Sequence, residues 1–252
     1  MSFDVTADAY DRFMGRFSRP LAGRLADFAE VGRGQRALDV GSGPGALTAE
    51  LVRRLGPDAV TAVDPSPPFI AALHERFPEV DARRGVAESL PFEDAAFDRT
   101  LAQLVVHFMK DPLAGLAEMV RVTRPDGVIA ACVWDHAGSA GPLTTFWQAV
   151  RDLDPGAPDE AGLAGVREGH LGDLFTSAGL GRVETTPLTV QVGFTSFEDW
   201  WEPFTLGVGP AGAHVARLDD DGREALRSRC SELLPAGPFR LSATAWGVRS
   251  RV

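Results

Sequence analysis

The chain has 252 residues, of which 44% are hydrophobic and 24% are charged, and its formal net charge at pH 7 is −10. This balance is typical of a globular protein and excludes a disordered chain. The length suits one large α/β domain or a domain with an insertion. The negative charge disfavours nucleic acid and anionic membranes as partners, because both need a basic face to bind.

Cysteine usage and the lack of targeting segments predict a cytoplasmic protein without a membrane partner. Cys132 and Cys230 lie far apart in an apolar and a helical pattern, so we expect two buried free thiols in a reducing compartment. The first residues have neither the basic nor the apolar part of a secretory signal. No apolar run approaches the roughly 18 residues that a membrane span needs.

The first half of the chain alternates short apolar runs with amphipathic segments, which is typical of a parallel sheet with right-handed crossovers. The strands are predicted at 36–40, 59–63, 80–83, 99–105 and 128–134. The helices are predicted at 46–55, 66–77 and 113–122, and a turn is predicted at 124–127.

Beyond Trp134 the chain is richer in Gly, Pro and Asp. Helical patterns cover 143–152 and 169–178, and a helical insertion covers 196–234. Two further strands, 182–192 and 239–248, are expected to complete the sheet. We therefore predict an α/β fold, a doubly wound, Rossmann-like sheet of seven mostly parallel strands with an α-helical cap insertion.

The segment 37–48, ALDVGSGPGALT, places Gly41, Gly43 and Gly45 between a predicted strand and a predicted helix. Such a turn lets the backbone approach a nucleotide-like ligand at the start of the helix. Asp64 follows the last of these glycines by 19 residues, where a second strand ends and a carboxylate can bind a ribose diol.

Two cofactor classes are compatible with this loop. Gly41-x-Gly43-x-x-Ala46 satisfies the dinucleotide pattern, so an NAD(P)-dependent oxidoreductase stays an alternative. A Tyr-x-x-x-Lys proton relay is impossible, however, because Tyr10 is the only tyrosine and Lys110 the only lysine.

Four segments in order, LDVGSGPG, VDPS, GVAESLPFEDAAFD and EMVRVTRPDG, resemble the motifs of class I S-adenosylmethionine-dependent methyltransferases. The resemblance is to the type 11 subgroup, which mostly acts on small molecules, and it covers Arg36 to Trp134. YDRFMGRFS resembles the entry segment of that subgroup. RVTRPDG departs from the usual pattern, since Asp126 replaces the first glycine of a pair, in a loop distal to the methyl donor.

The resemblance implies one methyltransferase domain over 1–252, with a cofactor-binding part at 1–134. The helical cap or substrate region is then 135–180 and 196–234. The cofactor is S-adenosyl-L-methionine, with its amino-acid end at Gly41, Ser42 and Gly43.

Further residues are expected beside the cofactor. The two oxygens of Asp64 would accept both ribose hydroxyls, with Pro65 and Ser66 flanking the ribose or adenine. By the resemblance, the loop of Ala87 and Glu88 reaches the adenine edge, although the Glu88 side chain is otherwise a solvated charge.

Two other segments complete the predicted cofactor site. Gln103 and Leu104 end a strand beside the glycine loop, where they would touch the methionine part. Tyr10 and Arg16 would close over the cofactor, the arginine meeting its carboxylate. The alternative for these two is a helix packed on the sheet with an exposed arginine.

His107, just past the fourth predicted strand, is the candidate general base, since it could take a proton from a phenol or hydroxyl. Lining the pocket or ordering the loop are its alternative roles. Many methyl transfers need only proximity and alignment of a reactive nucleophile, so a base is not required for activity.

An aromatic stripe at helical spacing, Phe197, Trp200, Trp201 and Phe204, is either core or the wall of a substrate pocket. We predict Trp147, Trp200, Trp201 and Phe204 in that pocket. No His/Cys spacing or acidic cluster suggests a metal site.

The sequence thus predicts methyl transfer from S-adenosylmethionine to an oxygen, nitrogen or carbon of a small, partly apolar molecule. A non-methylating isomerase or cyclase that binds the same cofactor is the alternative beside the oxidoreductase. The expected partner is the small-molecule substrate, and the expected state is a monomer or homodimer.

Overall fold

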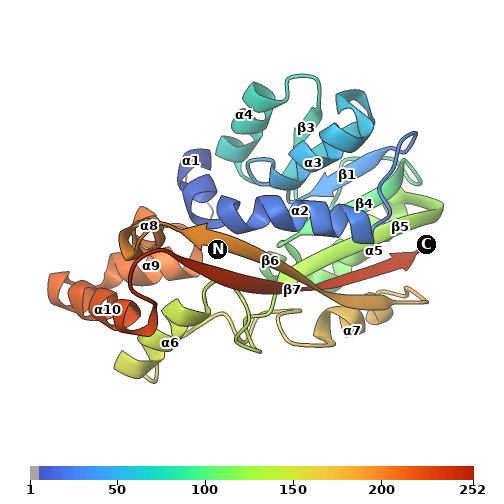
Figure 1. The fold of residues 1–252 in the computed structure, drawn as a ribbon. Coiled ribbons are helices and arrows are strands. Elements are labelled where there is room, and N and C mark those ends of the chain that lie inside the picture. Colours follow the sequence, from blue (N-terminus) through green and yellow to red (C-terminus); the bar gives the residue numbers. More distant parts are fainter. Residues whose placement is uncertain (1–5) are drawn as a thin grey trace.

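One seven-stranded sheet forms the centre of the computed structural model, which describes residues 6–252 (Figure 1). The strands are β1 (Ala37–Val40), β2 (Val60–Asp64), β3 (Asp81–Arg84), β4 (Phe97–Gln103), β5 (Thr123–Trp134), β6 (Glu184–Phe194) and β7 (Phe239–Arg251). Their order across the sheet is β3-β2-β1-β4-β5-β7-β6.

Strands β1 to β5 run parallel, and β7 pairs antiparallel with both β5 and β6. In this register Ala37 of β1 lies opposite Val60 of β2 on one side and Arg99 of β4 on the other. The prediction of a doubly wound sheet with seven mostly parallel strands is therefore confirmed. The strand order reverses at β1 and β4, and such a reversal opens a crevice at the carboxyl ends of the strands.

Helices precede the sheet, connect its strands and form the insertion. The helices are α1 (Ala7–Tyr10), the π-helix η1 (Asp11–Gly15), α2 (Arg16–Phe28), α3 (Ala46–Leu55), α4 (Pro67–Arg76), α5 (Pro112–Val122), α6 (Thr144–Leu153), α7 (His170–Ser177), α8 (Phe197–Trp201), α9 (Gly209–Arg217) and α10 (Asp220–Leu233). Short 3₁₀ turns are η2 (Pro57–Ala59), η3 (Val106–Phe108) and η4 (Glu202–Leu206).

The sequence explains where these helices begin. α5 starts at Asp111, whose carboxylate accepts the backbone N–H groups of Leu113 and Ala114, both at 3.0 Å. Pro112 fits the first turn because that position needs no backbone donor. α4 likewise opens with Pro67 after Ser66, as predicted.

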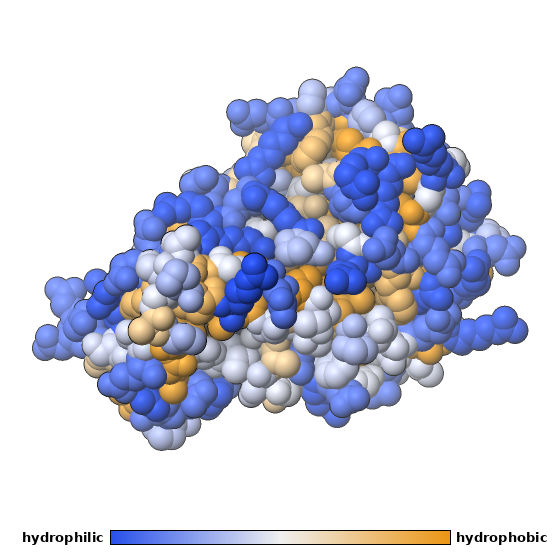
Figure 2. Space-filling model, in the orientation of Figure 1, coloured by the Kyte–Doolittle hydropathy of each residue, from blue (hydrophilic) through white to orange (hydrophobic). Residues whose placement is uncertain are grey.

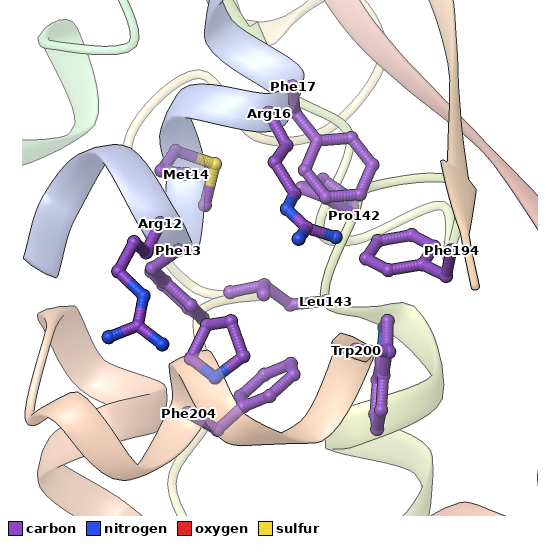
Figure 3. Close-up of a pocket in the computed structure, with 11 residues that line it drawn as sticks. Arg12, Phe13, Met14, Arg16, Phe17, Pro142, Leu143, Phe194, Trp200 and Phe204 are labelled. Atoms are coloured by element: carbon purple, nitrogen blue, oxygen red, sulfur yellow. The ribbon is translucent and has the colours of Figure 1, made fainter. Parts of the chain in front are cut away.

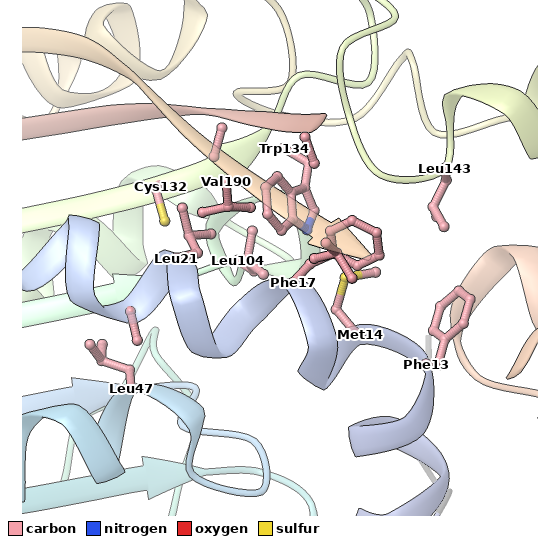
Figure 4. Close-up of a cluster of buried hydrophobic side chains, with 14 of the residues drawn as sticks. Phe13, Met14, Phe17, Leu21, Leu47, Leu104, Cys132, Trp134, Leu143 and Val190 are labelled. Atoms are coloured by element: carbon pink, nitrogen blue, oxygen red, sulfur yellow. The ribbon is translucent and has the colours of Figure 1, made fainter. Parts of the chain in front are cut away.

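Each face of the sheet carries its own core. One cluster joins α2 and α3 to the sheet and includes Phe17, Leu21, Leu47 and Trp134 (Figure 4). The other packs α5 and α7 on the opposite face and includes Leu116 and Phe175. Burial on both faces explains why the central strands read as continuous apolar runs.

Helices α6, α8, α9 and α10 gather at one end of the sheet and form the cap (Figure 1). Phe146 of α6 stacks on Phe204 of η4, with centroids 4.6 Å apart, so the two inserted segments share a core. The predicted cap segment 135–180 was too long, however. Its helix α7 packs on α5 and β7, because Leu171 and Phe175 are buried in the core of the sheet.

The predicted turn at 124–127 is part of β5. Asp126 has a left-handed φ of 64°, and its N–H donates to the carbonyl oxygen of Val252 at 3.0 Å. The ladder with β7 ends at Val128, opposite Arg251, and the carbonyl oxygen of Gly127 accepts the N–H of Val252 at 3.1 Å, so hydrogen bonding continues into the expected turn.

Polar and charged residues cover most of the face in Figure 2, with hydrophobic residues in small areas only. Within residues 6–252, every helix is too short or too polar to cross a membrane.

Candidate functional site

The glycine loop after β1 is held by the carboxylate at the end of β2. Asp64 is 6% exposed. One of its oxygens accepts the N–H of Gly43 and the other that of Ser66, both at 2.8 Å. Burial raises the pKa of this carboxyl, and the two N–H groups oppose the rise. Each oxygen keeps a second lone pair, so Asp64 can order both loops and still accept hydroxyl groups.

Gly41 and Gly43 are both left-handed, with φ of 67° and 55°, but their surroundings differ. A Cβ on Gly41 would lie 2.6 Å from Cγ1 of Val105, inside van der Waals contact. A Cβ on Gly43 would meet nothing within 4 Å. Gly41 thus serves internal packing, whereas Gly43 leaves open space for a ligand beside the backbone.

Asp39, in the middle of β1, is a buried carboxyl near the glycine loop that the sequence analysis did not single out. Its Oδ2 accepts the hydroxyl of Thr48 at 2.7 Å. Burial raises its pKa to about 7. Within residues 6–252, its Oδ1 has no hydrogen-bond partner, and the same holds for Ser42 Oγ and Gln103 Oε1. Buried polar atoms without partners are costly, so their occurrence around the glycine loop fits a polar ligand there.

Gln103 and Leu104 end β4 beside this loop. The Gln103 amide donates to the carbonyl oxygen of Ser18 at 2.9 Å, which connects β4 to α2. Leu104 has a left-handed φ of 63°, an uncommon conformation for a residue with a side chain. Such strain clusters at functional sites, which agrees with the prediction for this segment without testing it.

The other predicted adenine-side residues lie in loops at the same edge of the sheet. Pro65 is exposed and Ser66 half-buried. Ala87 is buried. The carboxylate of Glu88 accepts the N–H groups of Lys110 at 2.7 Å and Asp111 at 3.3 Å. The Glu88 side chain therefore orders the loop before α5, and its role at the cofactor stays a prediction.

The N-terminal segment lies between the sheet domain and the cap. Asp11 pairs with Arg76 of α4 at 2.8 Å, while Arg12 pairs with Glu202 of the cap at 2.6 Å. Tyr10 packs edge-on against Phe69, with centroids 5.5 Å apart. Its pKa is raised by burial and by the negative charge of Asp64. Tyr10 is thus close to the carboxylate that would bind ribose.

Arg16 forms an ion pair with Asp199 of α8. This pair lowers the pKa of the Asp199 carboxyl. Only 21% of the Asp199 side chain is exposed. The predicted contact of Arg16 with a cofactor carboxylate stays a prediction. To make this contact, Arg16 would have to leave Asp199.

A narrow pocket, here called the histidine pocket, brings together predicted residues from three separate segments. It is lined by Tyr10, Leu104, His107, Trp134, His136 and Glu160, among others. His107 is 6% exposed, and its pKa is lowered well below the ordinary value, first by burial and then by His136. His107 is therefore neutral at pH 7, and its burial disfavours the protonated form.

Glu160 and His136 in this pocket were not expected from the sequence. Glu160 is 4% exposed, and its carboxylate accepts the indole N–H of Trp147 at 2.9 Å. His136 Nε2 lies 4.0 Å from Glu160 Oε1. Burial raises the pKa of Glu160 to about 7 and lowers that of His136 to about 4. The connection after β5 is rich in Gly and Asp, and its sequence did not indicate that these two side chains are buried.

Glu160→Gln should remove a pH dependence of stability. The folded pKa lies above the usual 4.5, so the stabilisation by the neutral carboxyl is present at low pH and lost as pH rises through about 7. Relative to wild type, the variant should gain about 3 kcal/mol in unfolding free energy over this window. Urea unfolding at several pH values measures this. Exposed Glu168→Gln is the control. If the unfolding free energies of E160Q and wild type change with pH in parallel, the expectation is contradicted.

A second pocket, here called the cap pocket, is lined by Phe13, Phe17, Phe194, Trp200 and Phe204, among others (Figure 3). Trp200 and Phe204 thus line a cavity, and their role in a substrate pocket stays a prediction. Trp147 and Trp201 are 5% and 6% exposed and pack in the core around it. The cap pocket and the histidine pocket share Phe13, Met14 and Leu143, so they adjoin.

Across the part of the chain that the structure describes, no group of three or more His, Cys, Asp or Glu side chains could hold a metal ion. Cys132 and Cys230 are free and buried, and burial raises the pKa of each to about 12.

Comparison with known sequences points to one family. Residues 38–131 match the family described as "Methyltransferase domain". An uncharacterized methyltransferase of Mycobacterium tuberculosis is 37% identical over 135 residues, which cover 54% of this chain and 52% of that protein. A demethylmenaquinone methyltransferase of Renibacterium salmoninarum is 33% identical over 145 residues, covering 58% and 59%. The chain thus spans about half the length of the curated relatives it matches.

Comparison with solved structures supports the fold. The putative methyltransferase from an antibiotic biosynthesis pathway of Anabaena variabilis superposes with a TM-score of 0.61. The match covers 92% of this chain and 96% of that one at 18% sequence identity. At this identity the likeness shows a shared fold over most of the chain.

Proposed function

We propose that this chain is a class I S-adenosylmethionine-dependent methyltransferase of type 11 that methylates a small, partly apolar molecule, a proposal supported by the match of residues 38–131 to the methyltransferase-domain family. The acceptor atom is an oxygen, nitrogen or carbon. The observation that carries the proposal is the pair formed by Asp64 and the glycine loop. It provides a rigid acidic end of β2 next to a backbone turn with open space at Gly43.

The residues fit S-adenosylmethionine, which when bound supplies an electrophilic methyl group on a sulfonium. Gly43 and Ser42 would hold its amino-acid end, and Asp64 would bind its ribose hydroxyls. Gln103 and Leu104 would line its methionine part, and Tyr10 would cover it. The adjoining cap and histidine pockets would then hold the acceptor.

In such a reaction the protein would align the acceptor with the methyl group and exclude water from both. The acceptor pockets are lined mainly by aromatic and aliphatic side chains. Neutral His107 would accept a hydrogen bond from the acceptor and would take its proton as the methyl group is transferred.

Calorimetric titration tests the cofactor class. Micromolar binding of S-adenosylmethionine and S-adenosylhomocysteine, with no heat from NAD(P)H, is the expected result. Binding of the nicotinamide alone would overturn the proposal in favour of an oxidoreductase. Binding of S-adenosylmethionine that remains intact after incubation with a broad acceptor panel would instead favour a non-methylating isomerase or cyclase.

Gly43→Ala should weaken cofactor binding strongly while it destabilises the fold only slightly. A Cβ at this position meets no protein atom within 4 Å, so the only cost to folding is the left-handed backbone, about 1–2 kcal/mol. The same Cβ would occupy the space proposed for the cofactor. We expect at least tenfold weaker binding of S-adenosylhomocysteine by calorimetry, with Gly34→Ala, another left-handed glycine with open space, as control. Equal affinities would place the cofactor elsewhere.

A further inference from the structure

The cap pocket has a positively charged lining, although the chain as a whole carries a net charge of −10. Arg12 of η1 and Arg16 of α2 line it (Figure 3). Their side chains are 43% and 35% exposed, so both remain accessible to a ligand. The other described residues of the lining are aromatic, aliphatic, proline or methionine, and none of them is acidic. Such a lining attracts an anion and repels a cation.

The guanidinium of Arg16 faces the interior of this pocket. Its Cζ lies 5.3 Å from the ring centroid of Phe194, which also lines the pocket. Figure 3 shows the side chain leaving α2 and ending between Phe194 and Leu143. A guanidinium over an aromatic face is stabilised by the negative potential of the ring. Arg16 is therefore already held where a ligand in the pocket would meet it.

The ion pair between Arg16 and Asp199 uses only part of the guanidinium. Within residues 6–252, its only hydrogen bond runs from Nη2 to Oδ1 of Asp199. A guanidinium has five N–H donors and two edges, each of which can donate two parallel bonds to one carboxylate. A single oxygen on Nη2 occupies one of these edges at most, so a carboxylate in the cap pocket could bind Arg16 without displacing Asp199. The glycine loop, residues 41–45, does not line this pocket, so a carboxylate held there would not meet Arg16 in its present position.

The adjoining histidine pocket has the opposite character. Glu160 lines it, and no arginine or lysine of the described chain does. Tyr10 and Leu104, which are predicted beside the cofactor, also line it. The reacting atom of the acceptor therefore belongs in the histidine pocket, where the Glu160 carboxyl disfavours a second anion. A negatively charged group of the same molecule belongs in the cap pocket, which shares Phe13 and Leu143 with the histidine pocket.

We infer that the cap pocket binds the carboxylate of an aromatic carboxylic acid through Arg16, an inference that rests on the proposed function. The two oxygens of a carboxylate match the open edge of the guanidinium. The rings of Phe17, Phe194 and Trp200, which line the same pocket, suit the flat apolar body of such a molecule. The acceptor then has two distinct ends, a carboxylate at Arg16 and a methylated atom in the histidine pocket.

Calorimetric titration of the protein saturated with S-adenosylhomocysteine tests this inference. The probes are 3-phenylpropionate and its uncharged analogue 3-phenylpropanamide. Wild type should bind the acid at least about tenfold more tightly than the amide, because hydrogen bonds between two charged groups are stronger than those to a neutral one. Arg16→Gln should remove this preference, since its affinity for the acid should fall about tenfold while its affinity for the amide stays the same.

Asp199→Asn distinguishes ligand binding from a structural role of Arg16. If Arg16 serves only to hold α2 against α8, the ion pair is what matters, and R16Q and D199N should lose affinity for the acid together. If Arg16 binds the acid, D199N keeps the guanidinium and removes a competing negative charge, so it should bind the acid at least as tightly as wild type. Arg19→Gln is the matched control, because Arg19 lies on the same helix, is 63% exposed and does not line the pocket.

The outcomes separate this inference from the proposed function, and the affinity of every variant for S-adenosylhomocysteine shows whether it is folded. Equal affinity of wild type for acid and amide, an unchanged preference in R16Q, or a joint loss in R16Q and D199N overturns this inference alone. Failure of the wild type to bind S-adenosylhomocysteine overturns the proposed function, and this inference with it.

Discussion

Gly41→Ala is expected to destabilise the folded protein by about 2–5 kcal/mol. A left-handed backbone costs an alanine roughly 1–2 kcal/mol, and overpacking adds roughly 1–3 kcal/mol. The overpacking arises because the new Cβ would overlap both γ-methyl groups of Val105, one of them at 2.6 Å. The midpoint of urea unfolding, with an unchanged slope, measures the loss.

A double-mutant cycle separates the two causes. Val105→Ala removes the overlapping methyl groups, so the double variant should be more stable than the sum of the single changes predicts, by about 1–2 kcal/mol. Gly34→Ala has a φ of +83° and no atom within 4 Å, so it should show the backbone cost alone. Strict additivity of G41A and V105A would mean that the loop relaxes away from Val105.

Asp64→Ala is expected to weaken binding of S-adenosylhomocysteine by at least tenfold. The change strands the ribose hydroxyls of the ligand, and it also frees the N–H groups of Gly43 and Ser66, which now donate to the carboxylate at 2.8 Å. Each lost charge-assisted hydrogen bond costs about 1–3 kcal/mol. Calorimetry measures the affinity directly.

Two further variants show whether a loss of affinity in D64A comes from the missing carboxylate. Exposed Asp58→Ala, which lies before the same strand, should bind like wild type. Asp64→Asn keeps one acceptor oxygen and should fall between wild type and D64A. If D64A keeps the wild-type affinity, Asp64 is not part of the cofactor site.

The regular part of the fold could be predicted from local patterns. Helix 46–55 has the predicted bounds, because Leu47 and Leu51 repeat at helical spacing and Gly56 ends the helix. The strands alternate with helices as expected, and their parallel pairing follows from that alternation. The start of β5 was less predictable, since the strand begins at Thr123 and not at Val128, and residues 126 and 127 form their hydrogen bonds with Val252, more than a hundred residues later.

The glycine-loop part of the site could likewise be predicted from local sequence, whereas the histidine pocket could not. Gly41, Gly43 and Asp64 lie in a strand–turn–helix pattern whose geometry is local, so their neighbourhood followed from spacing. Glu160 and His136 meet His107 only because the connection after β5 folds back over the carboxyl end of β4. The partner of Arg16 is likewise 183 residues distant.

The sequence by itself determined the sheet, the glycine loop and the cofactor class that the loop resembles, because those features repeat over a few residues along the chain. Only the tertiary structure decided which cap residues face a cavity and which pack in the core. It also decided which buried polar atoms find partners. Burial and hydrogen bonding depend on segments far apart in the chain, and they set the charge of His107 and Glu160.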